Sequence, residues 1–355
     1  MLRGIRNVVL ARTGIPPYCS GEVALYAFNG KKRNLKTRLS DCAYALLKSS
    51  FPWEQEFNRR VIREVRPDYI HAHYAVNAAY YEHLRVETDA PLILSCYGYD
   101  VSSFPNRYLG YGARYLRKAW NWASVVLAMS DDMRTDLIRL GCPPEKIRIH
   151  YHGIDLSQFE AASEAANDSQ VRILYAGSLG DERKGIEFLL GAFAAAASIR
   201  PGIVLRIIGE GAMRPRYEQL ARRLGIGSQV EFTGFVPHEE IAREMRTAQI
   251  FCHPSLTTKS GDKEGIPGTI VEAMAMGLPV VATRHAGIPE MVLHQITGVI
   301  VPERDTRELA DALVKLIDDP VLRRKLGNAG IERARLHADA SRQAAELLSI
   351  YRSLP

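Results

Sequence analysis

The sequence predicts an α/β protein of two doubly wound, Rossmann-like domains. Its 355 residues exceed the roughly 100 to 200 residues that one domain usually holds. In the second half, short apolar runs alternate with helix-forming segments, which is typical of a parallel sheet covered by helices. These runs, the expected strands, lie at 171–176, 204–208, 230–232, 250–253 and 280–282.

Five further strands are expected in the first half, at 5–10, 69–71, 91–95, 124–129 and 146–150. Residues 11–21 are expected to form the loop after the first of them. The stretch 156–170 is rich in Ala, Ser, Glu and Asn, and it predicts a hinge. After Asp305 the sequence predicts only helices, the last of them at 338–351.

The composition is that of an ordinary globular protein, with 46% apolar and 24% charged residues. No stretch approaches the ~20 apolar residues of a membrane span, and residues 1–10 lack the apolar core of a signal peptide. The sequence therefore predicts a cytoplasmic protein. The five cysteines are scattered and lack CxxC spacing, so we expect free thiols and neither a disulfide framework nor a zinc site.

Positive charge is concentrated in the first half. Residues 1–155 hold 22 Lys and Arg against 15 Asp and Glu, whereas 156–355 hold 24 against 25. A basic surface could face nucleic acid, an anionic membrane or a phosphorylated acceptor. Residues 107–122 interleave aromatic and basic side chains at near-helical spacing. This pattern favours an amphipathic core helix over an interfacial helix on anionic lipid.

The stretch 262–283 combines a loop, a helix and a buried strand. Glycines and a proline at its start interrupt regular structure, and a helix is expected from there to 276. The first-turn amides of a helix have no partner within it and carry partial positive charge, so this entry offers phosphate oxygens a binding place. The residues expected around the phosphates are Gly265, Ile266, Pro267, Gly268 and Thr269.

Two carboxylates, Glu264 and Glu272, bracket this place. Because carboxylates repel phosphate, we expect them to accept hydrogen bonds from neutral hydroxyls, those of a transferred sugar and of a ribose. Two glutamates at this spacing would by themselves favour a plain surface helix. The flanking Gly and Pro residues favour the binding site.

Glu264 and Glu272, with seven residues between them and followed by AMAMGLPVVATRHAGIPEMV, resemble the signature of the retaining glycosyltransferases of family 4. The likeness is closest to the branch that builds bacterial exopolysaccharides, and it extends over about 68–302. It implies the GT-B fold, in which two Rossmann-like domains face each other across a cleft. The implied parts are an acceptor-binding domain at 1–155, a nucleotide-sugar-binding domain at 156–334, and a helix at 335–355 that crosses back to the first domain.

The resemblance assigns further donor-binding residues in the second domain. In the turn GSLGDERKG, Lys184 matches the family's lysine that binds the diphosphate. The family's arginine usually follows the first glycine, Gly177, where this chain has Ser178, and Arg183 is expected to replace it from across the loop. A surface charge pair is the alternative. Gly209 and the main chain around Val236 are expected to line the pocket for the base.

In the first domain, Tyr97 stands where the family has a histidine near the transferred sugar. Tyrosine can donate a hydrogen bond, but it titrates near ~10 rather than ~6.5 and cannot act as an imidazole would at neutral pH. His71 and His73 lie at the end of an expected strand, which favours a sugar-facing rim over half of a metal site. The residues expected to face the acceptor or the sugar are Gly21, His73, Asn77 and Asp100.

The resemblance implies transfer of a hexose-type sugar from a nucleoside diphosphate sugar, with a UDP-sugar favoured, to an acceptor hydroxyl with retention. The expected catalytic residues are Glu264, Lys184, Arg183 and Tyr97. The chain has no Asp-x-Asp triplet, the metal-holding motif of the other large glycosyltransferase fold, so we expect no metal and no cofactor.

The expected partners are the nucleotide sugar and a glycan, lipid-linked or small-molecule acceptor, with contact to an anionic membrane if the acceptor is carried on a lipid. Nucleic acid is not expected, because the basic residues follow no recognisable motif. A glycoside hydrolase could also use two carboxylates, but it does not need the phosphate turn. A non-catalytic nucleotide-sugar binder is the other alternative, suggested by Tyr97 and by the single Gly21 where the family usually has two glycines.

Overall fold

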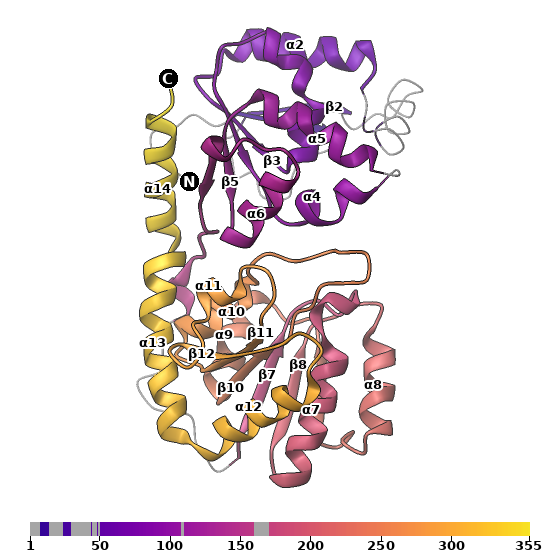
Figure 1. Cartoon of the computed structure of the whole chain (residues 1–355), viewed down its shortest axis with the longest axis vertical. Coiled ribbons are helices and arrows are strands. Elements are labelled where there is room, and N and C mark those ends of the chain that lie inside the picture. Colours follow the sequence, from indigo (N-terminus) through magenta and orange to yellow (C-terminus); the bar gives the residue numbers. More distant parts are fainter. Residues whose placement is uncertain are drawn as a thin grey trace.

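The computed structural model describes residues 8–13, 24–29, 44, 48, 50–107, 110–159 and 170–355. Gly21 and most of the expected hinge lie outside the described residues. The described part forms two α/β domains, one above the other in Figure 1, with two C-terminal helices running along the same side of both.

The first domain contains a parallel four-stranded sheet in the order β3-β4-β5-β6 and a separate parallel pair, β1-β2. Its strands are β1 (Val8–Thr13), β2 (Ala24–Asn29), β3 (Ile70–His73), β4 (Leu92–Ser95), β5 (Ala123–Ala128) and β6 (Ile147–Ile149). Its α-helices are α2 (Pro52–Val65), α3 (Ala75–Tyr80), α4 (Tyr99–Ser102), α5 (Tyr111–Trp122) and α6 (Asp131–Arg139). Short 3-10 helices are η1 (Glu82–Val86), η2 (Phe104–Asn106) and η3 (Pro144–Lys146).

The second domain is a parallel six-stranded sheet in the order β12-β11-β10-β7-β8-β9. Its strands are β7 (Arg172–Ala176), β8 (Val204–Ile208), β9 (Val230–Gly234), β10 (Ile250–His253), β11 (Val280–Thr283) and β12 (Gly298–Val301). Its α-helices are α7 (Ile186–Ile199), α8 (Arg214–Arg223), α9 (His238–Thr247), α10 (Gly268–Ala275), α11 (Ile288–Met291), α12 (Thr306–Asp318) and α13 (Pro320–Ala338). The short 3-10 helices η4 (Leu156–Gln158) and η5 (Glu182–Lys184) precede and follow β7.

The central strands of the second sheet are buried on both faces. Along β7, Ile173 and Tyr175 pack into one hydrophobic cluster, and Leu174 and Ala176 pack into another on the opposite face. Residues that alternate along a strand point to opposite faces, so this sheet is covered by helices on both sides. The predicted two-domain α/β class is confirmed, as are all five strands expected in the second half.

The structure corrects four local expectations. Residues 11–13 belong to β1 rather than to the loop after it, and β3 continues to His73. The strand β2 and the edge strand β12 were not expected. Only the four-residue helix α11 lies between β11 and β12, so the alternation of strand and helix that marks the other strands is weak there.

The C-terminal helix α14 (Ala340–Arg352) lies against the sheet of the first domain (Figure 1). Leu347, Ile350 and Tyr351 pack on the buried side chains of β4 and β5. Asp339 separates α13 from α14, and its side chain accepts a hydrogen bond from the amide of Arg342. The chain therefore passes between the domains twice, near residue 154 and at Asp339, and the two passages pair through Ile154.

Candidate active site

The donor-side residues gather at the carboxyl ends of β7 and β10. The strand order runs outward from β7 through β8 and β9, then restarts on the other side of β7 with β10. Such a reversal point is where open α/β sheets bind ligands. Two glycines close this edge tightly: Gly209 has a φ of 140°, and a Cβ there would overlap the carbonyl oxygen of Gly177.

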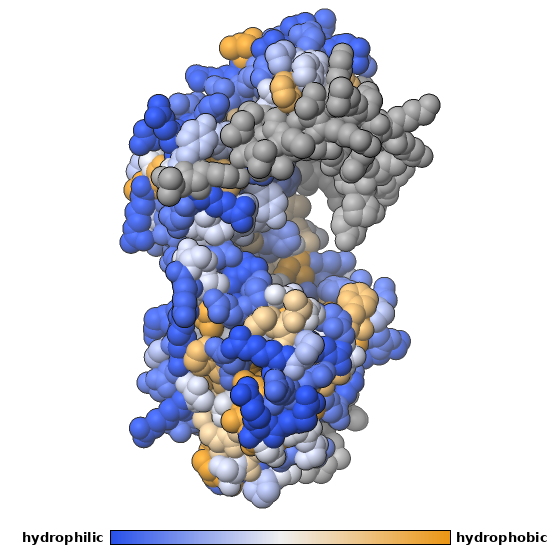
Figure 2. All heavy atoms as spheres, turned by 90° about the vertical axis from the view of Figure 1, so that its right-hand side faces the viewer, coloured by the Kyte–Doolittle hydropathy of each residue, from blue (hydrophilic) through white to orange (hydrophobic). Residues whose placement is uncertain are grey.

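Helix α10 begins beside this edge with no side chain capping its first turn in the described structure. Pro267 is its N-cap residue, and Thr269 donates a hydrogen bond to the carbonyl of Ala176 at 3.0 Å, which ties the helix start to the end of β7. The stretch 261–269 is half-buried. A Cβ on Gly265 would lie 3.8 Å from Met129 Sδ, so this stretch faces the first domain. Figure 2 shows the surface hollowed between the two domains.

Glu264 is the most densely connected of these residues. Its carboxylate pairs with the ammonium group of Lys184 and accepts a hydrogen bond from the hydroxyl of Ser255. His253 Nε2 lies 3.6 Å from the same carboxylate, and the amide of Glu264 donates to His285 Nε2 at 3.2 Å. Burial alone would raise the pKa of Glu264, but His253 and Lys184 lower it well below its usual range. Glu264 is therefore an ionised, fixed hydrogen-bond acceptor.

A second layer of side chains holds this acceptor in place. His285 is fully buried, and its Nδ1 lies 2.7 Å from Glu303 Oε1. Burial would raise the pKa of Glu303, but His285 and hydrogen bonds from Thr257 lower it to about 2. A carboxylate-imidazole pair of this kind fixes both the tautomer and the orientation of the ring.

Arg183 lies where it was expected but is engaged by carboxylates. Its guanidinium makes two hydrogen bonds to Asp181, at 3.0 and 2.7 Å, and lies 3.4 Å from Asp262. The hydrogen bond to Asp181 raises the pKa of Arg183. In the ligand-free structure Arg183 therefore forms a charge pair, which was the alternative to a role in phosphate binding. Ser178 is exposed, and its hydroxyl accepts from the amide of Gly180 at 3.1 Å.

Glu272 lies one turn inside α10 and is buried. One carboxylate oxygen is 3.2 Å from His238 Nε2, and the other has no hydrogen-bond partner in the described part of the chain. Burial raises the pKa of Glu272, and His238 opposes this shift. A buried acceptor without a partner costs ~1–3 kcal/mol, so this oxygen is suited to a ligand hydroxyl. Val236 is half-buried and packs against the core beneath α10.

Among the first-domain residues, Tyr97 and His73 lie together, with Tyr97 Oη 2.6 Å from His73 Nδ1. Asn77 is half-buried and donates to the carbonyl of His73 at 2.8 Å. The expectation that Asp100 faces the acceptor or the sugar is wrong. Asp100 is fully buried, and its carboxylate accepts the amides of Ala75 and Tyr97, at 2.7 and 3.1 Å. It positions the Tyr97 loop from inside.

The loop before α10, residues 261–267, is called the donor loop, and it also contacts the first domain directly. Lys263 Nζ lies 3.0 Å from Asp132 and 2.9 Å from Asp136, both on α6. Ser102 donates to Asp262 at 3.1 Å and accepts the amide of Lys263 at 3.2 Å. The loop that carries Glu264 is thus held from both sides.

Two family models match the chain in succession. Residues 6–158 match the model described as Glycosyltransferase Family 4, and residues 157–333 match the model described as Glycosyl transferases group 1. The chain belongs to glycosyltransferase family 4. The resemblance drawn from the two glutamates and the segment after them is confirmed, and with it the GT-B fold.

Named relatives of this family 4 chain include glycosyltransferases of colanic acid and amylovoran biosynthesis and an alpha-D-kanosaminyltransferase. WcaL of Escherichia coli K12, named for colanic acid biosynthesis, is 33% identical over 217 residues, 61% of this chain and 53% of WcaL. The amylovoran biosynthesis glycosyltransferase AmsK of Erwinia amylovora is 36% identical, over 54% of this chain and 47% of AmsK. The alpha-D-kanosaminyltransferase of Streptomyces kanamyceticus is 28% identical over 87% of this chain and 83% of its own length. The match spans about half the length of WcaL and of AmsK.

Solved structures share the fold. Sucrose-phosphate synthase of Thermosynechococcus elongatus has a TM-score of 0.73 at 25% identity, over 85% of this chain and 77% of its own. HepE of Anabaena, solved with UDP and glucose, has a TM-score of 0.75 at 20% identity, over 94% of this chain and 87% of its own.

The side chains that support Glu264 were not predicted from the sequence. The missed residues are His253, Ser255, His285 and Glu303. Two of them could have been predicted, because His253 ends an expected strand and Ser255 follows it closely. His71 and His73 were selected on the same ground, their position at the end of a strand. The long-range pairing of His285 with Glu303 had no such signal.

Helix α5 is a core helix, as its pattern favoured. It buries Tyr115, Leu116 and Trp120, while Arg117 and Lys118 are exposed.

No helix among the described residues is long and apolar enough to cross a bilayer. The described residues also contain no group of three or more His, Cys, Asp or Glu arranged to hold a metal ion.

Proposed function

We propose that this chain is a retaining glycosyltransferase. It moves a hexose-type sugar from a nucleoside diphosphate sugar to an acceptor hydroxyl, in the biosynthesis of an exopolysaccharide or another glycoconjugate. The observation that carries the proposal is the pair of Lys184 and Glu264 beside the uncapped start of α10, at the carboxyl edge of the second sheet. The names of WcaL and AmsK support the process.

The diphosphate lies at the first turn of α10, where main-chain amides point outward, with Lys184 beside it. Glu264 accepts hydrogen bonds from the transferred sugar, and the unpartnered oxygen of Glu272 accepts one from the ribose. The bond between the anomeric carbon and the phosphate oxygen breaks, and a bond from the acceptor oxygen forms on the same face. The acceptor proton passes to the leaving phosphate. Each fixed hydrogen-bond donor at the leaving group lowers the activation free energy by roughly 3–4 kcal/mol in such reactions.

The donor base is proposed to be uracil. HepE was solved with UDP and glucose, whereas a relative from Corynebacterium glutamicum is named for GDP-mannose. A thermal-shift screen against UDP-, GDP- and ADP-sugars decides between them, because a ligand at ~100 times its dissociation constant stabilises the folded state by about 2.7 kcal/mol. A larger shift with a GDP-sugar would overturn the choice of UDP.

Activity is proposed to be independent of added metal. Leaving-group charge would be balanced by Lys184 and the amides of α10, and the described residues offer no metal-binding cluster. Turnover should therefore survive EDTA. Loss of turnover in EDTA and recovery with Mn²⁺ or Mg²⁺ would show this to be wrong.

A lipid-carried acceptor would bring the exposed basic face of α5 to an anionic membrane, since Arg114, Arg117 and Lys118 all lie on that face. Co-sedimentation with phosphatidylglycerol vesicles but not with phosphatidylcholine vesicles is the expected result. Equal sedimentation with both would argue against this contact.

A non-catalytic nucleotide-sugar binder is the second candidate, favoured by Tyr97 at the position of the family histidine. The decisive experiment incubates the preferred nucleotide sugar with an acceptor panel and follows the product by NMR. Transfer with an unchanged anomeric configuration supports the transferase. Nucleotide-sugar binding without transfer to any acceptor, or an inverted product, contradicts it.

A further inference from the structure

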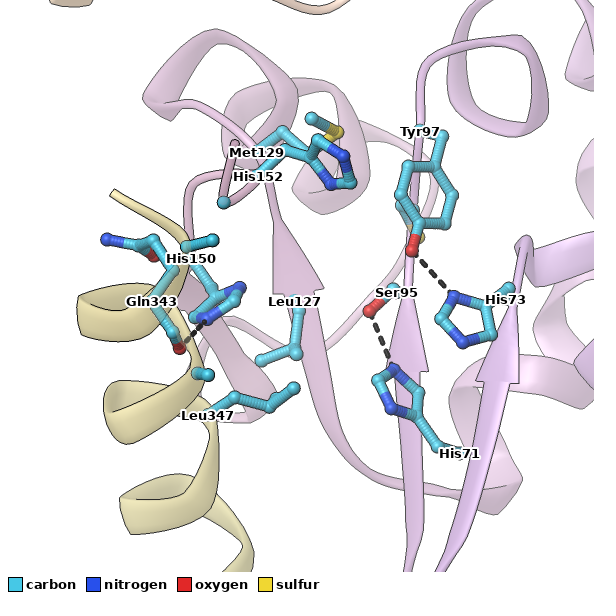
Figure 3. A pocket seen from close by; sticks show the side chains of 14 residues that line it. His71, His73, Ser95, Tyr97, Leu127, Met129, His150, His152, Gln343 and Leu347 are labelled. Atoms are coloured by element: carbon cyan, nitrogen blue, oxygen red, sulfur yellow. Dashed lines mark hydrogen bonds between the residues drawn. The ribbon is translucent and has the colours of Figure 1, made fainter. Parts of the chain in front are cut away.

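A cavity of about 230 Å³ lies at the carboxyl ends of β3, β4 and β5, where α14 crosses them (Figure 3). It is distinct from the phosphate site, because its lining comes from the first domain, the passage between the domains and α14. Four histidines line it, two from β3 and two from the chain after β6: His71, His73, His150 and His152.

Hydrogen bonds fix three of the imidazoles. His71 lies between two hydroxyls, with Nδ1 2.6 Å from Tyr351 Oη and Nε2 2.8 Å from Ser95 Oγ. His73 Nδ1 is 2.6 Å from Tyr97 Oη, and His150 Nε2 donates to the carbonyl of Gln343 at 3.0 Å. In the described structure this leaves His73 Nε2, His150 Nδ1 and both nitrogens of His152 open to another partner.

The lining carries little charge. Burial, together with His73 and His150, lowers the pKa of His71 to about 3. Burial also lowers the pKa values of His73 and His152, and a neighbouring histidine adds to each shift. All three shifts favour the uncharged form of the ring. The described residues that line the cavity include no Lys, Arg, Asp or Glu.

A neutral imidazole offers one donor and one acceptor, and so does a hydroxyl group. A phosphate or carboxylate accepts hydrogen bonds only, and it binds best where a cation or charged donor faces it. The walls between the polar groups are apolar and include Leu127, Met129 and Leu347. A sugar ring has both features, with hydroxyls at its edge and C–H groups on its faces. The volume is below the roughly 300–1,000 Å³ of sites for drug-sized ligands, which suits one monosaccharide ring.

The cavity adjoins the donor loop. Tyr97 and Met129 line it, and the same two residues face Gly265, where a Cβ would lie 3.8 Å from Met129 Sδ and 4.0 Å from the carbonyl oxygen of Tyr97. We propose that this cavity binds an uncharged sugar ring of the acceptor. The inference rests on the proposed function and specifies its acceptor: a glycan whose ring next to the reacting centre carries no phosphate or carboxylate.

The test fills the cavity from α14. Ala344 lines it, whereas Ala345, the next residue on the helix, is exposed, so Ala344→Phe and Ala345→Phe form a matched pair. Saturation-transfer NMR with the methyl glycosides of glucose, galactose and mannose should give a signal for the unmodified chain. That signal should be lost in Ala344→Phe and kept in Ala345→Phe. Glucose 1-phosphate resembles part of the donor, so any signal it gives should be unchanged in Ala344→Phe.

Three results would overturn the inference. The first is no signal from any of the glycosides, and the second is a glycoside signal that survives Ala344→Phe. The third is a signal from glucose 1-phosphate that is as strong as that of the glycosides and is lost in Ala344→Phe. If Ala344→Phe does not fold, Ala344→Leu takes its place with the same expectations. Titrations with UDP and GDP run in parallel on all variants. If neither nucleotide binds the unmodified chain, the proposed function fails, and that failure is separate from the result for the glycosides.

Discussion

The ammonium group of Lys184 pairs with the carboxylate of Glu264, 80 residues further along the chain. Both side chains are largely shielded from solvent, with 17% and 11% of their surfaces exposed. In the ligand-free chain Lys184, which is expected to bind the leaving phosphate, is therefore paired with Glu264, which is expected to bind the sugar. We infer that a bound diphosphate would share Lys184 with Glu264, because both anions lie beside the same cation.

Lys184→Ala should lower turnover by roughly 10²–10³-fold, the usual effect of losing one fixed donor at a developing negative charge. Lys259→Ala is the matched control, since Lys259 is exposed on the nearby loop. Steady-state kinetics of both variants with the preferred donor provide the measurement. Equal kcat in Lys184→Ala and the control would remove Lys184 from the reaction.

Glu264 should contribute to stability in a pH-dependent way. Its pKa is depressed in the folded protein, where burial opposes the shift and His253 and Lys184 produce it. Its stabilising effect is therefore complete above the unfolded value of ~4.3 and is lost as the pH falls below it toward the folded pKa. Glu264→Gln should lower the free energy of unfolding at pH 7 and make its decline below about pH 4.5 shallower. Urea unfolding at several pH values measures this, and identical pH slopes in both proteins would contradict it.

Glu272 should discriminate ribose from deoxyribose in the donor. Its unpartnered oxygen is suited to a ribose hydroxyl, so the unmodified chain should bind the ribose form of the nucleotide better than the 2′- or 3′-deoxy form. In Glu272→Ala the ratio of the affinities for the ribose and deoxy forms should fall to about one, while the deoxy forms bind nearly as before. Calorimetric titration gives both affinities. A preference that persists in Glu272→Ala would place the ribose elsewhere.

Lys263 should link donor binding to the position of the first domain, through its pairs with Asp132 and Asp136. Partly exposed pairs are worth ~0.2–1 kcal/mol each, so losing both in Lys263→Met should raise the donor KM by roughly two- to thirtyfold. Added salt should raise the KM of the unmodified chain more than that of the variant, because salt screens the pairs that the variant lacks. The exposed Lys325, changed to Met, is the control. Identical salt dependence in all three proteins would contradict the link.

The sequence was most informative where function constrains consecutive residues. The strands of the second sheet, the Gly and Pro entry to α10 and the family signature lie in short segments, so their pattern is visible without the fold. Asp100 shows the limit. Its acidic side chain after a strand predicted a ligand contact, yet it binds two main-chain amides inside the first domain. Whether a carboxylate faces a ligand or its own backbone depends on how two segments pack, which local sequence does not record.

The same limit explains the histidines of the cavity. His71 and His73 were visible as a pair on one strand, but His150 and His152 joined them only through the parallel order of β3 to β6 and the return of α14. Long-range polar networks such as Glu264, His285 and Glu303 likewise form between segments that have no sequence feature in common.

Lys184 and the start of α10 are proposed to bind the diphosphate rather than the base. The most direct test is a set of four calorimetric titrations, in which UDP and uridine are each titrated into the unmodified chain and into Lys184→Met. If the thermal-shift screen favours a GDP-sugar, GDP and guanosine take their place. UDP should bind much more tightly than uridine to the unmodified chain. Lys184→Met should remove most of this difference while leaving the affinity for uridine unchanged. An equal advantage of UDP over uridine in both proteins would contradict it.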